Sequence, residues 1–434
     1  MTKHLLMIVP FFPPIAGGGV YRPLSFVKYL GNYGWRTTVV TPQASSFWIT
    51  DPALLEHVPP ECDVRRTRTL SGQYLLSVVR GRGGKPSATR NQVRSSRRFS
   101  VLRKIGATFL IPDTYIGWYP FAVGEGRRVI GDKKIDAIYS TSPPETTHLI
   151  AKKLHDISGI PWVADFRDPW MNLYLLPRPT RWHEKVHERL ERSVCSRAAA
   201  VVTNHWHLEL LERRHPGRQR ITIIPNGYDP ADVESVEGIE PPRGGFCIVH
   251  AGMLTQTRSA EPFLEGLRRF IDANPGAEDD CRVEFVGPRE SNNDAHVDRL
   301  GLGSVVTFSG TVAHHETLKI EKASHILLLI KHANPDYDGI IPGKLFEYIG
   351  LRRPILALVP RGEAHRIVTD LNRGVVAPVE DPDAIARALS TMYDAHRRGR
   401  LDSSFDLGPI GDYRRDVLTG RLADYLNSIL ERGA

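Results

Sequence analysis

The stretch from Asp338 to Glu347 holds the charges best suited to chemistry. Pro342 fits the first turn of a helix, where its missing N–H costs nothing, and Gly343 keeps that turn open. Lys344 adds a positive charge to a helix N-terminus, which itself attracts anions. Glu347 shares a helix face with Lys344, and a carboxylate there can bind sugar hydroxyls. We interpret the stretch as a nucleotide-sugar site, with Asp338 as a second candidate carboxylate, rather than as a plain i,i+3 ion pair.

Three adjacent glycines, Gly17, Gly18 and Gly19, form a second candidate site for an anion. They follow an expected strand at Leu5–Phe12 and precede an expected helix, so Gly18 and Gly19 could let donor phosphates or the acceptor approach the backbone. The dinucleotide fingerprint G-x-G-x-x-G fails, because Arg22 occupies its third glycine position. This disfavours a nicotinamide enzyme, and a flexible turn is the alternative.

Arg258 occupies the corresponding place in the second half of the chain. It ends the segment Gly252–Arg258, which follows an expected strand at Phe246–Ala251. A guanidinium at the start of a helix can hold a diphosphate in a two-pronged grip. An ordinary surface arginine is the alternative.

Charged residues crowd the end of an expected strand at Trp162–Phe166. Asp165, Arg167 and Asp168 are candidates for a catalytic role, because charge gathered at one strand end is costly unless it is paired or functional. An Arg–Asp clamp that fixes the loop is an equally simple explanation. His148, close to the start of the next expected helix, is a further catalytic candidate, although a lone histidine there is more often structural.

Strand-like apolar runs alternate with amphipathic helical stretches along the whole chain of 434 residues. This pattern predicts an α/β fold with two Rossmann-like, doubly wound parallel sheets that face each other across a cleft. We expect an N-terminal domain at residues 1–232, a C-terminal domain at 246–405 and a helical tail at 406–434 that could pack back on the first domain. Ligands of such sheets bind at the carboxyl ends of the strands.

Composition excludes several classes of protein. The four cysteines are scattered, which argues against a disulfide framework and a structural zinc site, and no run approaches the ~20 apolar residues of a membrane-spanning helix.

The net charge of +8 comes from one segment, Arg80–Lys104, which has nine cationic and no acidic residues. This basic segment could be a solvated insertion, or it could meet an anionic membrane surface or a phosphate-bearing acceptor. Nucleic acid is disfavoured, because few aromatic residues lie nearby. We expect a cytoplasmic protein.

Taken together, these motifs resemble those of GT-B glycosyltransferases of family 4 type, and more narrowly the bacterial branch that builds exopolysaccharide, capsule or O-antigen. The resemblance spans nearly the whole chain and is most specific at Pro342–Glu347. It also rests on the loop 11–19 with Arg22-Pro23, on Ser142-Pro143-Pro144, and on residues 165–170, 225–229 and 250–258.

The resemblance implies a hexosyltransferase that moves a sugar from a nucleoside-diphosphate sugar, with retention and without a metal ion or other cofactor. The acceptor would be a glycan, a polyprenyl-linked glycan or a small molecule bound by the N-terminal domain, and the enzyme could be peripheral on the inner face of the plasma membrane. In the C-terminal domain, Arg258 and Lys344 would hold the diphosphate and Glu347 the ribose.

The chain departs from the family pattern at two places. The family commonly has two glutamates eight positions apart, but Gly339 stands eight before Glu347, with Asp338 beside it. Many members carry a histidine after the strand that ends at Phe166, where this chain has Arg167 and Asp168. A nucleotide-sugar 2-epimerase of the same fold, or a non-catalytic donor-binding paralogue, therefore stays open as an alternative.

Overall fold

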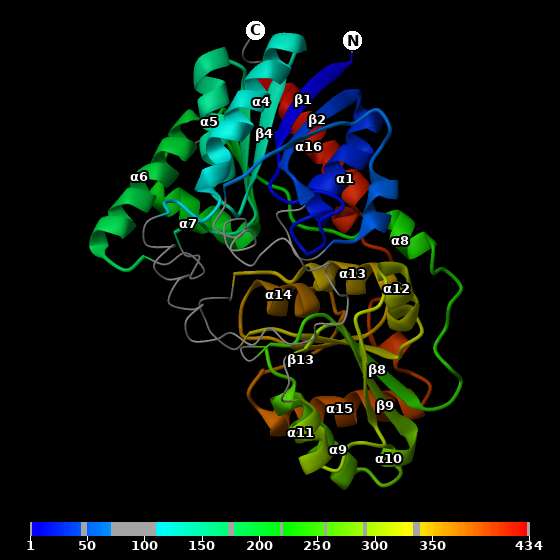
Figure 1. Ribbon diagram of the computed structural model, residues 1–434. Coiled ribbons are helices and arrows are strands. Elements are labelled where there is room, and N and C mark those ends of the chain that lie inside the picture. Colours follow the sequence, from blue (N-terminus) through cyan, green and yellow to red (C-terminus); the bar gives the residue numbers. More distant parts are fainter. Residues whose placement is uncertain are drawn as a thin grey trace, which may run out of the picture. The chain divides into compact units, whose positions relative to one another are not determined.

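The computed structural model describes residues 2–44, 50–70, 110–171, 178–217, 220–255, 258–289, 293–332 and 339–431. The chain divides into two compact units (Figure 1). Unit 1 contains the N-terminal part up to Asn226 together with the C-terminal segment that starts at Arg415, and unit 2 comprises Gly227–Arg414. Asp338 and the basic segment Arg80–Lys104 lie outside the described residues.

The described strands of unit 1 form a seven-stranded parallel sheet in the order β3-β2-β1-β4-β5-β6-β7. Alternate residues of β1 enter different cores: Leu5 and Met7 pack on one face, Leu6 and Ile8 on the other. The strands are β1 (Lys3–Ile8), β2 (Trp35–Pro42), β3 (Asp63–Thr67), β4 (Ala137–Ser142), β5 (Trp162–Phe166), β6 (Ala200–Thr203) and β7 (Ile221–Ile223).

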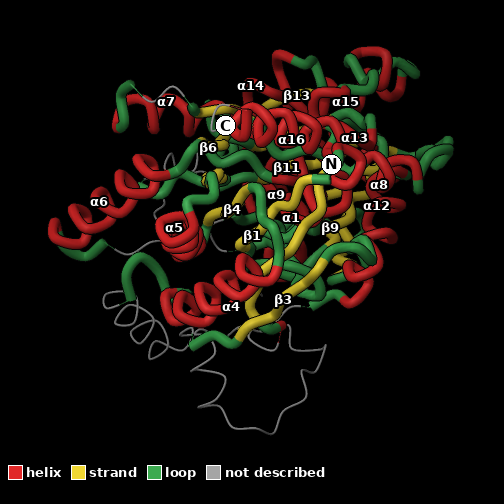
Figure 2. The backbone as a smooth tube through the Cα atoms, turned by 90° about the horizontal axis from the view of Figure 1, so that it is seen from above, coloured by secondary structure: helices red, strands yellow, loops and turns green. Residues whose placement is uncertain are grey.

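Helices cover both faces of this sheet. On the first face α1 (Tyr21–Leu30) packs against α16 (Arg415–Glu431), the C-terminal helix, whose Leu418, Leu422 and Leu426 join the same core as β1. Figure 2 shows α16 running beside α1. The opposite face is covered by α4 (Tyr119–Asp132), α5 (Thr146–Ser158), α6 (Arg181–Arg197) and α7 (His205–Arg214).

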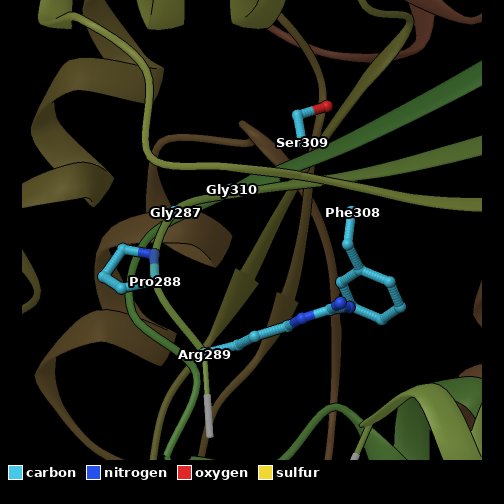
Figure 3. A pocket seen from close by; sticks show the side chains of 6 residues that line it. All are labelled: Gly287, Pro288, Arg289, Phe308, Ser309 and Gly310. Carbon is cyan, nitrogen blue, oxygen red and sulfur yellow. The ribbon is translucent and has the colours of Figure 1, made fainter. Parts of the chain in front are cut away.

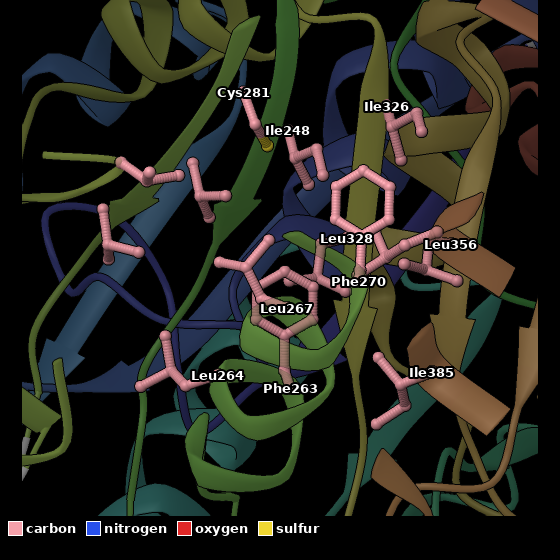
Figure 4. Close-up of a cluster of buried hydrophobic side chains, with 14 of the residues drawn as sticks. Ile248, Phe263, Leu264, Leu267, Phe270, Cys281, Ile326, Leu328, Leu356 and Ile385 are labelled. Atoms are coloured by element: carbon pink, nitrogen blue, oxygen red, sulfur yellow. The ribbon is translucent and has the colours of Figure 1, made fainter. Parts of the chain in front are cut away.

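The described strands of unit 2 form a six-stranded parallel sheet in the order β10-β9-β8-β11-β12-β13. Figure 4 shows one of its two cores, in which Ile248 and Leu328 of the sheet meet Phe263 and Phe270. The strands are β8 (Phe246–Ala251), β9 (Cys281–Val286), β10 (Val306–Gly310), β11 (Ile326–Ile330), β12 (Ile355–Leu358) and β13 (Gly374–Ala377).

The helices of unit 2 also divide between the two faces. The core of Figure 4 lies under α9 (Glu261–Ala273), α11 (Asn293–Arg299) and α15 (Pro382–Arg397), while the other face packs against α12 (His314–Lys322), α13 (Gly343–Leu351) and α14 (Glu363–Asp370). Two short helices, α8 (Pro230–Glu234) and α10 (Ala277–Asp280), complete the unit.

The expected α/β fold with two doubly wound parallel sheets is confirmed. The strands at 162–166 and 246–251 coincide with the expected ranges. The sequence pattern did not reveal β3, α4, α7, α11, α14 or β13. Residue 232, the expected end of the first domain, lies inside α8, because Asp229 caps this helix and Pro230 opens it.

Candidate functional site

The strand order of unit 2 reverses between β8 and β11. In doubly wound sheets, ligands bind outside the carboxyl ends of the strands at such a switch point. The segment after β8 carries Arg258, and α13 is the helix that follows β11 and carries Gly343, Lys344 and Glu347. The fold therefore places these four predicted residues on segments that follow the two central strands at the same edge of one sheet.

The helix α13 is fixed firmly at this edge. Its buried Tyr348 hydroxyl accepts a hydrogen bond from the backbone N–H of Ala251 at 3.1 Å, which ties α13 to the end of β8. Gly350 lies so close to Tyr228 that an added Cβ would come within 2.6 Å of its ring, so only glycine fits there. Lys344 and Glu347 thus project from a rigidly held first turn, whereas Gly343 is exposed.

Lys344 is the centre of a charged network. Its Nζ donates to Oε1 of Glu321 on α12 at 2.8 Å and also to Oε1 of Glu347. The Glu321 side chain is fully buried, while those of Lys344 and Glu347 are 29% and 19% exposed. Since an ammonium carries three N–H groups, two bonds to carboxyls leave one for a ligand that approaches from solvent. The ammonium of Lys344 is therefore held in place and is still accessible to a ligand.

The pKa shifts in this network show where its charges reside. Burial lowers the pKa of Lys344, but attraction by Glu347 and Glu321 outweighs it and raises that pKa. Burial raises the pKa of Glu347, but Lys344 and a hydrogen bond with Glu321 bring it down to about 2. Burial and repulsion by Glu347 raise the pKa of Glu321 well above its usual range. The shifts favour the charged forms of Lys344 and Glu347 and the neutral form of Glu321.

A histidine–aspartate pair borders the network. His314 Nε2 lies 3.1 Å from Oδ2 of Asp232 on α8. Burial lowers the pKa of His314, but the hydrogen bond to Asp232 and attraction by Glu347 outweigh it and raise that pKa. These contacts favour the charged form of His314 beside Glu347. The sequence reasoning missed Glu321, His314 and Asp232, although an acidic residue beside Leu318 on the apolar face of the expected helix was a usable signal for Glu321.

Arg258 lies on the other side of the switch point. Its backbone N–H and C=O pair with Thr255, and its Nη2 lies 3.4 Å from Nε2 of His332, just after β11. Burial, together with the charges of Arg258 and Lys344, lowers the pKa of His250, at the end of β8, to about 4, against the hydrogen bond to the carbonyl of Leu328, which raises it. Arg258 and Lys344 therefore both lie close enough to His250 to lower the pKa of its imidazole. No metal-binding group of acidic, histidine or cysteine side chains occurs among the described residues.

A small pocket lies at the carboxyl ends of β9 and β10. It has a volume of about 270 Å³ and is lined by Gly287, Pro288, Arg289, Phe308, Ser309 and Gly310. Figure 3 shows the Arg289 guanidinium extended over the ring of Phe308, with 3.9 Å between guanidinium carbon and ring centre. Ligand pockets typically measure ~300–1,000 Å³, so this one suits a single ring system rather than a whole ligand. The loop after β8 borders it, because Leu254 bonds to Pro288.

In unit 1, a buried ion pair fixes the corresponding switch point between β1 and β4. Arg22 donates from Nε and Nη2 to the two carboxylate oxygens of Asp165, at 2.8 and 2.9 Å. Tyr139 and Thr141 also donate to Asp165, and Arg22 donates to the carbonyl of Pro225. Asp165 is therefore saturated by bonds inside the protein, so the clamp expected as the alternative exists, with Arg22 as its cation.

Arg167 binds backbone carbonyls rather than a carboxylate. Its guanidinium donates to Ser142 at 3.0 Å, to Pro143 at 2.7 Å and to Gly19 at 3.3 Å. A Cβ at Gly19 would lie 3.0 Å from Arg167 and 2.9 Å from Phe11, whereas a Cβ at Gly18 would meet nothing within 4 Å. The close packing explains the need for glycine at position 19, and Gly18 is exposed.

Asp168, unlike Asp165 and Arg167, has no bonding partner among the described residues. Its side chain is partly exposed and makes no hydrogen bond or ion pair within the described part of the chain, while burial raises its pKa. Glu145, at the start of α5, is fully buried, and neither carboxyl oxygen has a partner in the described ranges. Burial and the charges of Asp113 and Asp168 raise the pKa of Glu145 well above its usual range. Asp168 is thus the carboxylate at this strand end that has no bonding partner among the described residues and is partly exposed.

His148 lies in the core of unit 1. Its side chain is fully buried, its Nδ1 is 2.8 Å from the hydroxyl of Ser140, and its ring packs on Phe166 at 4.5 Å between ring centres. Burial lowers the pKa of His148 to about 3. A neutral histidine closed off from solvent is placed for packing, which favours the structural explanation over the catalytic one.

Comparisons with known proteins agree with this architecture. Residues 17–227 match a family model described as a glycosyl transferase 4-like domain. No match was found among curated proteins. One similar solved structure is sucrose-phosphate synthase from Thermosynechococcus elongatus, with 14% identity and a TM-score of 0.65 over 99% of this chain and 100% of that chain. A second is Anabaena Alr3699/HepE in complex with UDP and glucose, with 14% identity and a TM-score of 0.64 over 98% of this chain and 100% of that chain. A third is a putative UDP-N-acetylglucosamine 2-epimerase from Listeria monocytogenes, with 11% identity and a TM-score of 0.56 over 100% of this chain and 98% of that chain. At these identities the likeness shows a shared fold.

Proposed function

We propose, from the premise that residues 17–227 are a glycosyl transferase 4-like domain in a chain with the GT-B fold, that this protein transfers a sugar from a nucleoside diphosphate to an acceptor hydroxyl. The observation that carries the proposal is the network of Lys344 at the switch point of unit 2. There, a fixed cation and the N-terminus of α13 favour the negative charge of a diphosphate.

The other groups at this edge match the remaining parts of the donor. Glu347 offers a charged carboxylate to ribose hydroxyls, and Arg258 offers a guanidinium to the second phosphate. The pocket beside Arg289 and Phe308 suits the nucleobase in size and provides a flat face to stack on. The Anabaena relative is described as a complex with UDP and glucose, which supports a uridine donor.

The reaction breaks the bond between the anomeric carbon and the diphosphate oxygen, whose electron pair leaves with the diphosphate. The acceptor oxygen forms the new bond on the same face of the sugar, so configuration is retained, and its proton passes to the departing phosphate oxygen. Fixed cations neutralise the charge that develops on the leaving group. Lys344 and Arg258 perform this task in the proposal, which requires no metal ion.

Unit 1 binds the acceptor in this proposal. Asp168 accepts a hydrogen bond from the attacking hydroxyl and so orients it, since its carboxylate is partly exposed and free of bonds within the described residues. Arg167 holds the loops of Gly19 and Pro143 in place around it. Gly18 leaves open space beside them for the acceptor.

We further propose a lipid-linked acceptor and attachment to the surface of an anionic membrane. All described helices are too short or too polar to cross a bilayer. Figures 1 and 2 show α6 at the periphery of unit 1, and its solvent-facing side carries a cationic stripe beside exposed Trp182, with exposed Glu184 and Glu188 on the same side. Cationic side chains attract anionic headgroups, and tryptophan favours the membrane interface. The stripe consists of Arg181, Lys185, Arg189 and Arg192.

Transfer is tested by incubation with UDP-glucose, GDP-mannose or their analogues and a polyprenyl-diphosphate glycan, followed by detection of the extended acceptor. Nucleoside diphosphate released only in the presence of acceptor supports the transferase. Conversion of the donor to its 2-epimer without acceptor identifies an epimerase instead, and binding of donor without either product identifies a non-catalytic paralogue.

A further inference from the structure

We infer that Arg289 determines which base the nucleotide donor carries, and that its guanidinium favours uracil over cytosine by bonding to a keto oxygen. The inference rests on the proposed function, because it takes the pocket at the carboxyl ends of β9 and β10 as the place of the base. It adds the side chain that recognises the base and the chemical group that this side chain recognises.

The guanidinium of Arg289 is held in one orientation. It lies over the ring of Phe308, with 3.9 Å between the guanidinium carbon and the ring centre (Figure 3). That ring in turn stacks on Phe285, with 5.1 Å between ring centres. Arg289 Nη2 also pairs with Oδ1 of Asp294 at 2.9 Å. A planar group that is fixed by two partners presents its N–H donors in a constant geometry, which discrimination between similar bases requires.

Arg289 supplies the charge of this pocket. Among the residues that line the pocket in the described chain, it carries the charged side chain, and the hydroxyl of Ser309 already donates to Glu284. Arg289 Nη1 is buried and has no hydrogen-bond partner in the described ranges. Because a buried N–H group without a partner is costly, a ligand oxygen that approaches this guanidinium compensates for part of that cost.

A guanidinium distinguishes uracil from cytosine by one exocyclic group. Uracil carries a keto oxygen, which accepts hydrogen bonds, at the position where cytosine carries an amino group, which donates them. Arginine has five N–H donors and no acceptor. The keto oxygen therefore gains a charge-assisted hydrogen bond from Arg289, whereas the amino group of cytosine would face N–H groups that it cannot bond.

The size and place of the pocket agree with a pyrimidine. Its volume of about 270 Å³ suits a single ring better than the fused rings of a purine. The backbone N–H of Leu254 donates to the carbonyl of Pro288 at 3.1 Å, and the loop of Leu254 continues to Arg258. A base beside Arg289 thus lies next to the segment that carries one of the cations proposed to bind the diphosphate.

The experiment measures the affinities of UDP, CDP, GDP and ADP for the full chain by titration calorimetry. We expect the wild type to bind UDP at least about tenfold more tightly than CDP, the size of one charge-assisted hydrogen bond. UDP should also bind more tightly than GDP and ADP. Arg289→Met keeps an apolar side chain on Phe308 and should weaken UDP about tenfold while CDP stays within about twofold, so that the preference disappears.

Two further variants serve as controls. Arg269→Met removes another arginine of unit 2 that pairs with an exposed aspartate, Asp383, and should leave both affinities unchanged. Arg289→Gln is the second test, which decides the inference even if Arg289→Met fails to fold. Its amide offers one donor and one acceptor group, so UDP and CDP should bind within about threefold of each other.

The outcomes separate the inference from the proposed function. Equal weakening of UDP and CDP in Arg289→Met overturns the inference, because the two nucleotides share the diphosphate and differ in the base. Equal affinities in the wild type, or tighter binding of CDP, GDP or ADP than of UDP, also overturn it and leave the proposed nucleotide site standing. If the wild type binds none of the four nucleotides, the proposed function fails as well.

Discussion

Arg22 and Asp165 stand 143 positions apart in the chain and form a buried, two-pronged ion pair, with distances of 2.8 and 2.9 Å. The pair joins the first turn of α1 to the end of β5. Removal of one partner from a buried pair leaves the other charge without compensation, which typically costs ~3–5 kcal/mol. We expect Arg22→Ala to lower the free energy of unfolding of unit 1 by about this amount, as measured by urea denaturation.

The matched control for this prediction is Arg65→Ala, because Arg65 forms an exposed ion pair with Asp63. Exposed pairs contribute ~0–1 kcal/mol, so this variant should unfold close to the wild type. Equal effects of the two substitutions would contradict a structural role for Arg22.

Lys344 and Arg258 are expected to bind the diphosphate of the donor. Lys344→Ala and Arg258→Ala should each weaken nucleoside-diphosphate binding by about 1.5–3 kcal/mol, the size of one charged hydrogen bond. Titration calorimetry with UDP and GDP measures the loss. Lys319→Ala, an exposed lysine on α12 that pairs with Glu316, serves as the control. Unchanged affinity in both variants would refute the donor-site assignment.

Asp168 is expected to act on the acceptor and not on the donor. Asp168→Asn keeps the size of the side chain but weakens its capacity to accept a hydrogen bond from a hydroxyl. We expect transfer to fall by about 10²-fold, the size typical of a lost orienting contact, while nucleotide affinity stays at the wild-type value. Initial rates with saturating donor measure the loss, and a parallel loss of nucleotide binding would contradict the prediction.

The buried histidines of unit 1 make the protein sensitive to acid. Burial lowers the pKa of His148 to about 3 and that of His207 to about 3, below the ordinary value of 6.5. Each therefore takes up a proton on unfolding below pH 6.5, so its contribution to stability is complete above that pH and is lost as pH falls toward 3. The slope is ~1.4 kcal/mol per pH unit for each histidine.

Urea denaturation between pH 5 and pH 8 measures this effect. Because His148 bonds to Ser140 through Nδ1, a His148→Gln variant should show a smaller decrease in stability on acidification than the wild type, whatever its stability at pH 8. An identical decrease would show that His148 does not titrate as described.

The cationic stripe on α6 is expected to bind anionic lipid. Lys185→Gln, Arg189→Gln and Arg192→Gln combined should reduce sedimentation with phosphatidylglycerol-containing vesicles, since each basic residue near the surface contributes about 1 kcal/mol. The control variant neutralises Arg65, Arg128 and Arg213, which are exposed cations of unit 1 outside α6. Equal binding by the two triple variants would argue against a surface on α6.

The segment Arg80–Lys104 can be tested in the same assay. Its deletion should leave nucleotide binding intact while it reduces vesicle association if the segment contributes to the membrane surface. Unchanged association would identify the segment as a plain insertion.

The sequence by itself predicted the fold class, which the structure confirms, and the candidate donor motif. Apolar runs and amphipathic stretches repeat with the periods of parallel strands and crossover helices, and Pro342–Glu347 marks a helix start by local rules, because these features depend on neighbours a few positions apart. The strand β3 was missed because its sequence, Asp-Val-Arg-Arg-Thr, lacks a continuous apolar run. It needs none, since β3 lies at the edge of the sheet.

Only the tertiary structure decided which charges meet. Asp165 looked as reactive as Asp168 in the sequence, yet the fold saturates Asp165 with Arg22 and leaves Asp168 without a bond in the described residues. Glu321 bonds to Lys344 because α12 and α13 pack side by side, and α16 packs against α1 although almost the whole chain separates them. These contacts link residues far apart in the chain, and their energies depend on burial and distance, which no local pattern specifies.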